Sequence, residues 1–226
     1  MANRPVYCSI DKAPFYKAID TEFEFFSGFS IQQKQKSIKS LHDSFLQKNV
    51  NKKVLEVYRK SDNPIGNRLS AFNLKYKHDG KSYPVECLFQ GSKKFEDGEV
   101  YQDLYNAEPG AAKKDDRLKN SGRIVCFKLF DKEFPSEPRD FFYNWLYINA
   151  LTENKEIRTE ILNYDSFTDI EFNPKKSINC QAIATTIFVG LSKGGLLRPA
   201  LESPESFKNI VYGKSQAEQM QLSLFD

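Results

Sequence analysis

The sequence predicts an α+β fold: a mainly helical single domain with a few short strands in its N-terminal half. A hydrophobic content of 40%, with 19 Phe and 11 Tyr, is ample for a core. Short strand-like segments occur in the first half, and segments with helical periodicity occur throughout. Their mixed order does not give the regular alternation of strand and helix that βαβ units require. These observations favour an α+β domain over a doubly wound parallel sheet.

The N-terminal region reads as two strands followed by a helix. The strands are expected over residues 4–10 and 21–26, with Gly28 as a turn. Ser30, followed three residues later by Gln33, has the form of a capping box. A helix is therefore expected from there to about residue 48, with its apolar stripe formed by Ile31, Ile38, Leu41 and Phe45.

The other face of this helix is basic. It carries Lys34, Lys36, Lys39 and Lys48, and Lys52 and Lys53 follow. A solvated helix face is the more common origin of such a pattern. The functional alternative is contact with a phosphate backbone, which needs local positive charge and no sequence motif.

A strand over residues 54–59 and a turn-rich segment lead to a hairpin. The pair Asp79-Gly80 is a strong hairpin signal after a strand over 74–77. Pro84 then suits the first position of a helix, expected to run for about three turns and to end near Gly98. On a helical period Glu86, Gln90 and Lys93 share one face. From spacing alone, Glu86 is an ordinary surface acid of a first helical turn.

The second half predicts three more helices and then a linker. A helix over 138–153 has the apolar stripe Phe141, Trp145, Ile148 and Leu151. A short helix over 154–164 follows, and a final helix is expected to end at about Lys193. Residues 198–217 contain two prolines and no periodic apolar stripe, so they are expected to form a linker.

Several classes of protein are disfavoured by composition. The net charge of +3 is too weak to indicate a nucleic-acid binder by itself. No apolar run is long enough to span a bilayer and no leader is visible, so a cytoplasmic protein is expected. The four cysteines lie far apart and are expected to be reduced, and the two histidines have no metal-ligand spacing. Neither a metal nor a cofactor is expected.

A set of motifs in one order resembles the NADAR superfamily. The residues are Tyr58, then Leu69-Ser70-Ala71-Phe72, then Gly80-Lys81-Ser82-Tyr83-Pro84, then Glu86-Cys87-Leu88-Phe89-Gln90-Gly91-Ser92-Lys93. They are similar to a family pattern of a strand ending in Phe-Tyr, a Leu-Ser-Asn-Phe loop and a Gly-Lys-x-aromatic-Pro…Glu…Gln…Lys block. Ala71 stands where the family has Asn, and Asn73 is the nearest residue that could replace that side chain.

Later segments extend the resemblance over roughly residues 54–197. Ala111-Ala112-Lys113 with Arg117 resembles a family helix, Trp145 matches a family tryptophan, and Ser177-Ile178-Asn179-Cys180-Gln181-Ala182 resembles the start of the last family helix. A family segment ending in Trp-Gly is absent, and residues 167–172 stand in its place. The extended N-terminus and this altered block are most similar to the NADAR branch encoded beside DarT-type DNA ADP-ribosyltransferase toxins.

The resemblance implies an N-glycosidase that removes ADP-ribose from guanine in DNA. Its motif glutamate, Glu86, would be the catalytic carboxylate, because a carboxylate stabilises an oxocarbenium-like transition state and can activate water. Asp169 and Glu171 are equal candidates for a second acid. Cationic candidates for the diphosphate are Lys93, Lys113 and Arg117. The other expected substrate contacts are Tyr58, Ser70, Phe72, Asn73, Gln90, Trp145 and Asn179.

Two of these contacts have equally plausible structural roles. Trp145 lies on an apolar helical stripe, where a tryptophan is more often part of the core. Asn179 precedes a helix and suits an N-cap.

The last residues contain a possible partner motif. Gln221-Leu222-Ser223-Leu224-Phe225 resembles the pentapeptide with which bacterial polymerases and repair proteins bind the sliding clamp. Residues 218–226 are therefore expected to form a clamp-binding tail, with Gln221, Leu222, Leu224 and Phe225 as its contacts. The alternative is a terminal segment that folds back on the domain.

The expected partners are therefore ADP-ribosylated DNA, the sliding clamp and a cognate DarT-type toxin. Two other functions remain open at this level. One is an N-glycosidase acting on a small riboflavin-pathway metabolite, for which a clamp peptide would have no use. The other is a non-catalytic antitoxin that binds ADP-ribose or the toxin, against which the retained Glu86 argues mildly.

Overall fold

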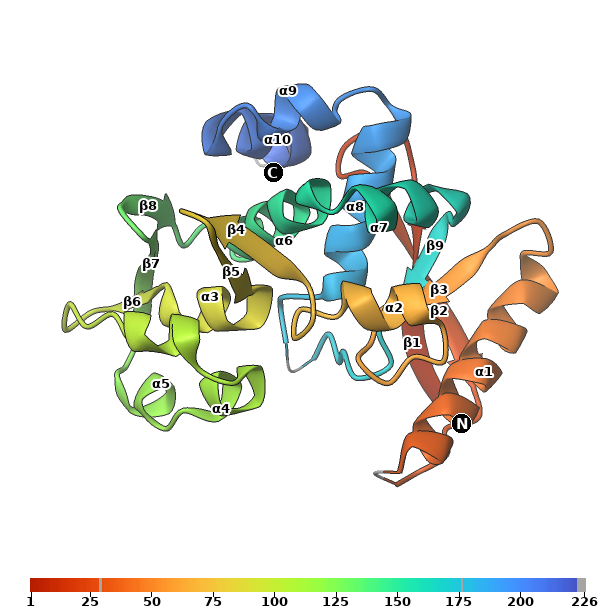
Figure 1. Ribbon diagram of the computed structural model, residues 1–226. Coiled ribbons are helices and arrows are strands. Elements are labelled where there is room, and N and C mark those ends of the chain that lie inside the picture. Colours follow the sequence, from red (N-terminus) through yellow and green to blue (C-terminus); the bar gives the residue numbers. More distant parts are fainter. Residues whose placement is uncertain (29, 176, 223–226) are drawn as a thin grey trace.

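The computed structural model describes residues 1–28, 30–175 and 177–222, with side chains to residue 213. It confirms the α+β class: helices surround three small sheets (Figure 1). The strands are not confined to the N-terminal half, however, because β7 (Ile124–Leu129), β8 (Lys132–Pro135) and β9 (Ser166–Thr168) lie in the second half of the chain.

The largest sheet has the order β2-β1-β9-β3. Strands β1 (Ala2–Ser9) and β2 (Tyr16–Phe23) form an antiparallel pair, and β9 (Ser166–Thr168) pairs antiparallel with β1. Both N-terminal strands were expected, but β2 begins and ends earlier than the expected range 21–26. β3 (Val54–Glu56), shorter than the expected strand, runs parallel to β9. The sheet thus places residues 57–58 beside residues 168–171, although they are far apart in sequence.

Helix α1 (Ile31–Lys48) packs on this sheet. It begins as expected, since the Ser30 hydroxyl accepts a hydrogen bond from the Gln33 N–H. Ile38, Leu41 and Phe45 are buried against strand residues such as Val6 and Phe23. Ile31 is 52% exposed and does not belong to the buried stripe.

The hairpin of β4 (Lys75–His78) and β5 (Lys81–Pro84) turns at Asp79 and Gly80, both with positive φ. Helix α3 (Val85–Gly91) follows, but it is shorter than expected and Pro84 is its N-cap. Strand β6 (Lys93–Phe95) begins directly afterwards and pairs with β7 (Ile124–Leu129), which in turn pairs with β8 (Lys132–Pro135). Residues 93–95 therefore form hydrogen bonds with β7 and do not extend the helix.

The segment between β6 and β7 contains a 3₁₀ helix (Gln102–Asn106) and the short helices α4 (Pro109–Lys114) and α5 (Arg117–Asn120). Figure 1 shows these helices beside α3 at one end of the molecule. The residues that resemble a single family helix therefore lie on two separate helices.

The core is built around α6 (Phe141–Glu153) and α8 (Gln181–Lys193). Both are buried on nearly every side, which explains why α6 has little amphipathic character. Helices α2 (Pro64–Leu69) and α7 (Lys155–Glu160) and a 3₁₀ turn (Ile161–Asn163) flank them. The large side chains Phe142, Leu146 and Phe188 are fully buried in this cluster.

Residues 198–217, expected as a linker, are helical. α9 (Leu197–Leu201) and α10 (Pro204–Leu222) lie over α6 and α8 (Figure 1). Phe207 is fully buried and Val211 is 1% exposed, so α10 belongs to the main core. The two prolines occur early in their helices, where they are tolerated, and do not mark a flexible segment.

Candidate functional site

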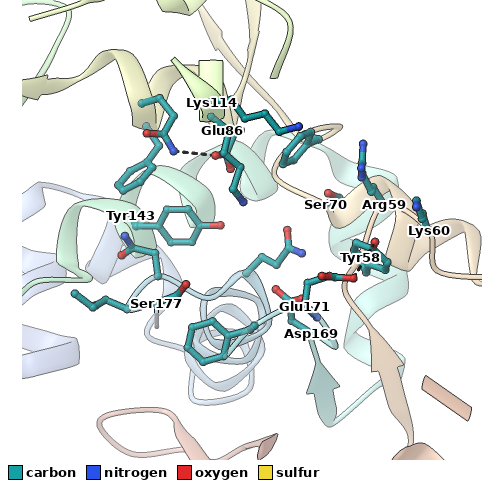
Figure 2. Close-up of a pocket in the computed structure, with 18 of the residues that line it drawn as sticks. Tyr58, Arg59, Lys60, Ser70, Glu86, Lys114, Tyr143, Asp169, Glu171 and Ser177 are labelled. Carbon is teal, nitrogen blue, oxygen red and sulfur yellow. Dashed lines mark hydrogen bonds between the residues drawn. The ribbon is translucent and has the colours of Figure 1, made fainter. Parts of the chain in front are cut away.

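A single cleft collects most of the residues expected from the sequence. Its cavity volume is about 580 Å³, within the range of small-molecule sites. Nine of the expected residues line it: Tyr58, Ser70, Phe72, Glu86, Gln90, Lys113, Asp169, Glu171 and Asn179. Figure 2 shows Glu86 and Tyr143 on one side of the cleft and Tyr58, Asp169 and Glu171 on another.

Glu86 lies in the first turn of α3 and is only 5% exposed. Its Oε1 accepts a hydrogen bond of 2.9 Å from Gln90 Nε2, and Gln90 Oε1 accepts one of 2.5 Å from Lys93 Nζ (Figure 2 for the first bond). The expected shared face of Glu86, Gln90 and Lys93 is confirmed, although Lys93 is on a strand. Glu86 is a buried carboxyl group and not the surface acid that spacing alone suggested.

The loop with Ser70 and Phe72 is fixed by two neighbouring segments. The Glu86 N–H donates to the Ala71 carbonyl at 2.9 Å, which ties the loop to α3. Gln181, at the start of α8, accepts from the Ala71 N–H at 2.9 Å and donates to the Val57 carbonyl at 2.6 Å. Gln181 therefore links the ends of three segments that line the cleft.

Asp169 and Glu171 lie in the turn after β9, and their surroundings differ. Burial raises the pKa of Asp169 to about 7, although the Glu171 N–H and the Lys113 charge oppose the shift. The Glu171 carboxylate is 2.8 Å from Lys34 Nζ and accepts a hydrogen bond of 3.3 Å from the Tyr58 hydroxyl. Asp169 therefore titrates near neutral pH, whereas Glu171 is held in an ion pair.

A further carboxyl group supports this turn from behind. Glu56, 2% exposed, accepts hydrogen bonds from the Thr168 hydroxyl at 2.5 Å and the Ile170 N–H at 2.7 Å. These bonds fix the residues on both sides of Asp169. Burial and the nearby Asp169 raise the pKa of Glu56 to about 8, so it binds a proton at neutral pH.

One side of the cleft combines an aromatic ring with cations. Arg59 and Lys113 lie over the Phe72 ring, 5.3 and 5.5 Å from its centroid. Lys34, Lys60 and Lys114 also line the cavity. This wall offers a stacking surface beside positive charge, which suits a base attached to phosphate.

Four expected substrate contacts lie elsewhere. Arg117 is exposed and pairs with Asp103 and Asp115 at 2.7 and 2.9 Å. Trp145 packs against Phe134 in the core, with ring centroids 4.8 Å apart, and is 7% exposed. This is the core position that its place on an apolar stripe favoured. Asn73 donates to the Asn67 carbonyl at 2.9 Å and does not line the cleft. Lys93 lines an adjacent cavity and reaches the cleft only through Gln90.

Asn179 is not the N-cap of α8. Cys180 occupies that position, and its side chain makes no capping hydrogen bond. Asn179 Oδ1 is buried without a hydrogen-bond partner among the described residues, and the residue lines the cleft. A buried acceptor without a partner at a cavity wall is suited to a ligand donor.

Sequence reasoning assigned no role in the cleft to Tyr143, Arg59, Lys60, Lys114, Phe172 or Gln181. Tyr143 is 5% exposed, and Figure 2 shows its hydroxyl directed into the cavity. Burial and the charge of Glu86 raise its pKa well above the usual value. It lies two residues before Trp145 on an almost entirely apolar helix. The sequence therefore does not indicate which of these two aromatic side chains faces the cavity, because that depends on the orientation of α6.

The described lining of the cleft contains both carboxylates and cations. Among the described residues, no group of three or more His, Cys, Asp or Glu side chains could hold a metal ion. All four cysteines are free, as expected. In the described part of the chain, no helix has the length and apolar character needed to cross a membrane.

The fold and the cleft define an α+β protein with buried acids, cations and an aromatic surface around one cavity, which is the class expected from the NADAR motifs. The profile of the DarT1-associated NADAR antitoxin family matches residues 2–221. The chain therefore belongs to the DarT1-associated NADAR antitoxin family. The match includes the N-terminal strands and α10, beyond the 54–197 range of the motifs. No curated protein matches the chain significantly.

Proposed function

We propose that this protein is an N-glycosidase that removes ADP-ribose from guanine in DNA and thereby counteracts a DarT-type toxin. The observation that carries the proposal is the presence of two carboxyl groups with different surroundings in one cavity. Glu86 lies in a hydrogen-bonded chain with Gln90 and Lys93, and Asp169 has a pKa of about 7. Hydrolysis of a glycosidic bond usually uses two carboxyl groups, one as an acid and the other as a base or nucleophile.

The proposed reaction uses each group once. Cleavage of the bond between ribose C1 and the base nitrogen develops positive charge on the sugar, which the Glu86 carboxylate stabilises. Glu86 also takes a proton from the attacking water. Asp169, about half protonated at pH 7 and more fully at lower pH, donates a proton to the departing base. Its pKa favours it over Glu171, whose carboxylate is paired with Lys34.

The cations would serve the phosphates of the substrate. Arg59 and Lys113 beside Phe72 suit one of the two nucleoside phosphates of the substrate, with its base stacked on the ring. Lys36, Lys39 and Lys48 are exposed on α1, the helix that brings Lys34 to the cleft, and would attract the DNA backbone.

The first test is Glu86→Gln, which keeps the size and one acceptor of the side chain. We expect its turnover of an ADP-ribosylated oligonucleotide to fall at least about 100-fold, since a general base contributes roughly 10² to 10⁴. Its affinity for ADP-ribose should stay within a few-fold of wild type by calorimetry. Glu133→Gln, a change at an exposed acid outside the cleft, is the control. Full activity of Glu86→Gln would exclude Glu86 as the catalytic carboxylate.

A further inference from the structure

A second cavity lies against the cleft. Its volume is about 670 Å³, and it shares the wall residues Phe89, Ile178 and Asn179 with the cleft. Its other lining residues come from β6, β7 and the segment before α6: Lys93, Arg123, Ile124, Phe127, Ser136, Glu137 and Arg139. The two cavities are therefore neighbouring parts of one continuous surface.

The second cavity is basic. Lys93, Arg123 and Arg139 face a single acid, Glu137. Arg123 is only weakly paired, with its Nε 4.0 Å from Glu96. Within the described part of the chain the Arg139 side chain makes no hydrogen bond or ion pair, so its guanidinium is available to an anion.

Lys93 connects this positive charge to the cleft. Its Nζ donates to Gln90 and lies 5.1 Å from the Phe89 ring centroid. Burial lowers its pKa, while the charge of Glu86 opposes that change. A partly desolvated cation at this junction would interact strongly with an anionic group that spans both cavities.

The wall between the cavities has apolar and polar groups that lack partners. Ile178 is 41% exposed, unusual for an isoleucine in a chain whose other isoleucines are mostly buried. It stands next to Asn179, whose buried Oδ1 has no hydrogen-bond partner in the described structure. Phe89 and Phe127 also line this cavity, with ring centroids 5.7 Å apart. A flat, partly apolar ligand with hydrogen-bond donors would cover the Ile178 side chain and donate to Asn179 Oδ1.

We propose that the second cavity binds a nucleoside phosphate, with the base against Ile178 and Asn179 and the phosphate at Arg139. This inference rests on the proposed function, whose substrate is too long for one cavity: it has a nucleoside phosphate on each side of the sugar bond that is cleaved. The occupant is either the adenosine diphosphate end of ADP-ribose or the nucleotide of the DNA strand. A simple inorganic anion would not explain the apolar wall, and an apolar ligand would not explain three cations.

The test uses Arg139→Gln in the full-length chain, with Lys132→Gln as the matched control. Lys132 is exposed on β8 and lines neither cavity. Calorimetry measures the affinity of each protein for ADP-ribose and for an unmodified single-stranded DNA pentamer with a central dG. We expect Arg139→Gln to weaken one of these ligands about tenfold or more, as loss of a charge-assisted phosphate contact does.

The two ligands distinguish the two sources. Weaker ADP-ribose binding alone would place the adenosine diphosphate in this cavity, and weaker pentamer binding alone would place the DNA nucleotide there. If Arg139→Gln matches Lys132→Gln within twofold for both ligands, or if the wild type binds neither, the inference is wrong. The proposed function fails on a different result, namely absence of turnover by the wild type.

Discussion

At the scale of single residues, Asp169 shows how burial changes the proton affinity of a carboxyl group. A carboxyl group in water is ionised at neutral pH, whereas burial raises the pKa of Asp169 to about 7. Glu171, two residues further on, is held by Lys34 and Tyr58. From the sequence, Asp169 and Glu171 were equal candidates for the second acid. Their surroundings in the folded protein distinguish them.

Asp169 is expected to govern the pH dependence of the reaction. If its protonated form donates to the leaving base, kcat should fall as the pH rises through about 7. Asp169→Asn cannot donate, so its activity should be low and lack this decline between about pH 5.5 and 9. Glu171→Gln, the control, should keep it. The assignment would be wrong if Asp169→Asn retained the wild-type profile in steady-state assays.

Glu56 is expected to make stability depend on pH. Its pKa of about 8 in the folded state lies above the value in an unfolded chain, so the native state keeps a proton that the unfolded state has lost. The free energy of unfolding should therefore fall as the pH rises from about 4.5 to 8. Glu56→Gln keeps the size of the group and removes its ionisation. The variant should gain about 1 kcal/mol relative to wild type between pH 7 and 8.

Urea unfolding at several pH values measures this difference. His42, whose pKa is lowered to about 4 by burial, is neutral in both states above pH 7 and does not obscure the comparison. Asp79→Asn changes an exposed acid and should give a constant offset from wild type. A constant offset for Glu56→Gln as well would mean that Glu56 is ionised in the native state.

At the scale of elements, the cleft depends on how strands and helices begin and end. β3 and β9 end side by side and place Tyr58 near Asp169 and Glu171. The start of α3 supplies Glu86, and the start of α8 supplies Gln181, which bonds to both Val57 and Ala71. The site therefore depends on the position of α8 relative to the sheet.

Gly190 sets that position. A Cβ there would lie 2.6 Å from the Ile10 carbonyl oxygen and 2.7 Å from that of Phe15, so α8 touches the β1–β2 connection directly. Backbone atoms cannot move aside easily, and Gly190→Ala should lower the free energy of unfolding by about 1–3 kcal/mol. Thermal or urea unfolding measures the change.

Gly110 provides the comparison for that experiment. It also lies in a helix, α4, and a Cβ there meets nothing within 4 Å. Gly110→Ala should be neutral or stabilising by up to about 1 kcal/mol. Equal effects of the two substitutions would contradict the close contact at Gly190.

At the scale of the whole molecule, α10 attaches the C-terminal region to the core. Phe207 and Val211 are buried, and Asn144 of α6 donates a hydrogen bond of 2.9 Å to the Tyr212 hydroxyl. The clamp-binding tail remains a prediction. Leu224 and Phe225 lie outside the described residues, and for Gln221 and Leu222 only the helical backbone is described.

Deletion of residues 220–226 tests the tail separately from the cleft. The buried contacts described for α10 are made by Phe207 and Val211, so we expect stability and turnover of a free oligonucleotide to stay near wild type. Binding to purified sliding clamp, measured by surface plasmon resonance, should be lost. Unchanged clamp binding, or none in the full-length protein, would refute the tail assignment.

Local sequence signals were reliable where the interaction is local. Ser30 caps α1, Asp79-Gly80 turns the hairpin, and the spacing of Glu86, Gln90 and Lys93 gives a hydrogen-bonded chain. The length of α3 was overestimated because β6 competes for residues 93–95 by pairing with β7, which lies about 30 residues further along. The local hydrophobic periodicity carries no information about pairing with a distant strand.

By itself, the sequence determined the α+β class, the family motifs and the glutamate at the start of α3, because motifs and caps are properties of neighbouring residues. Only the tertiary structure decided which residues face the cleft. It put Trp145 in the core and Tyr143 at the cavity, moved Arg117 to the surface, and packed residues 198–213 on the domain. It also separated Asp169 from Glu171, because proton affinity depends on burial and on charges brought together from distant parts of the chain.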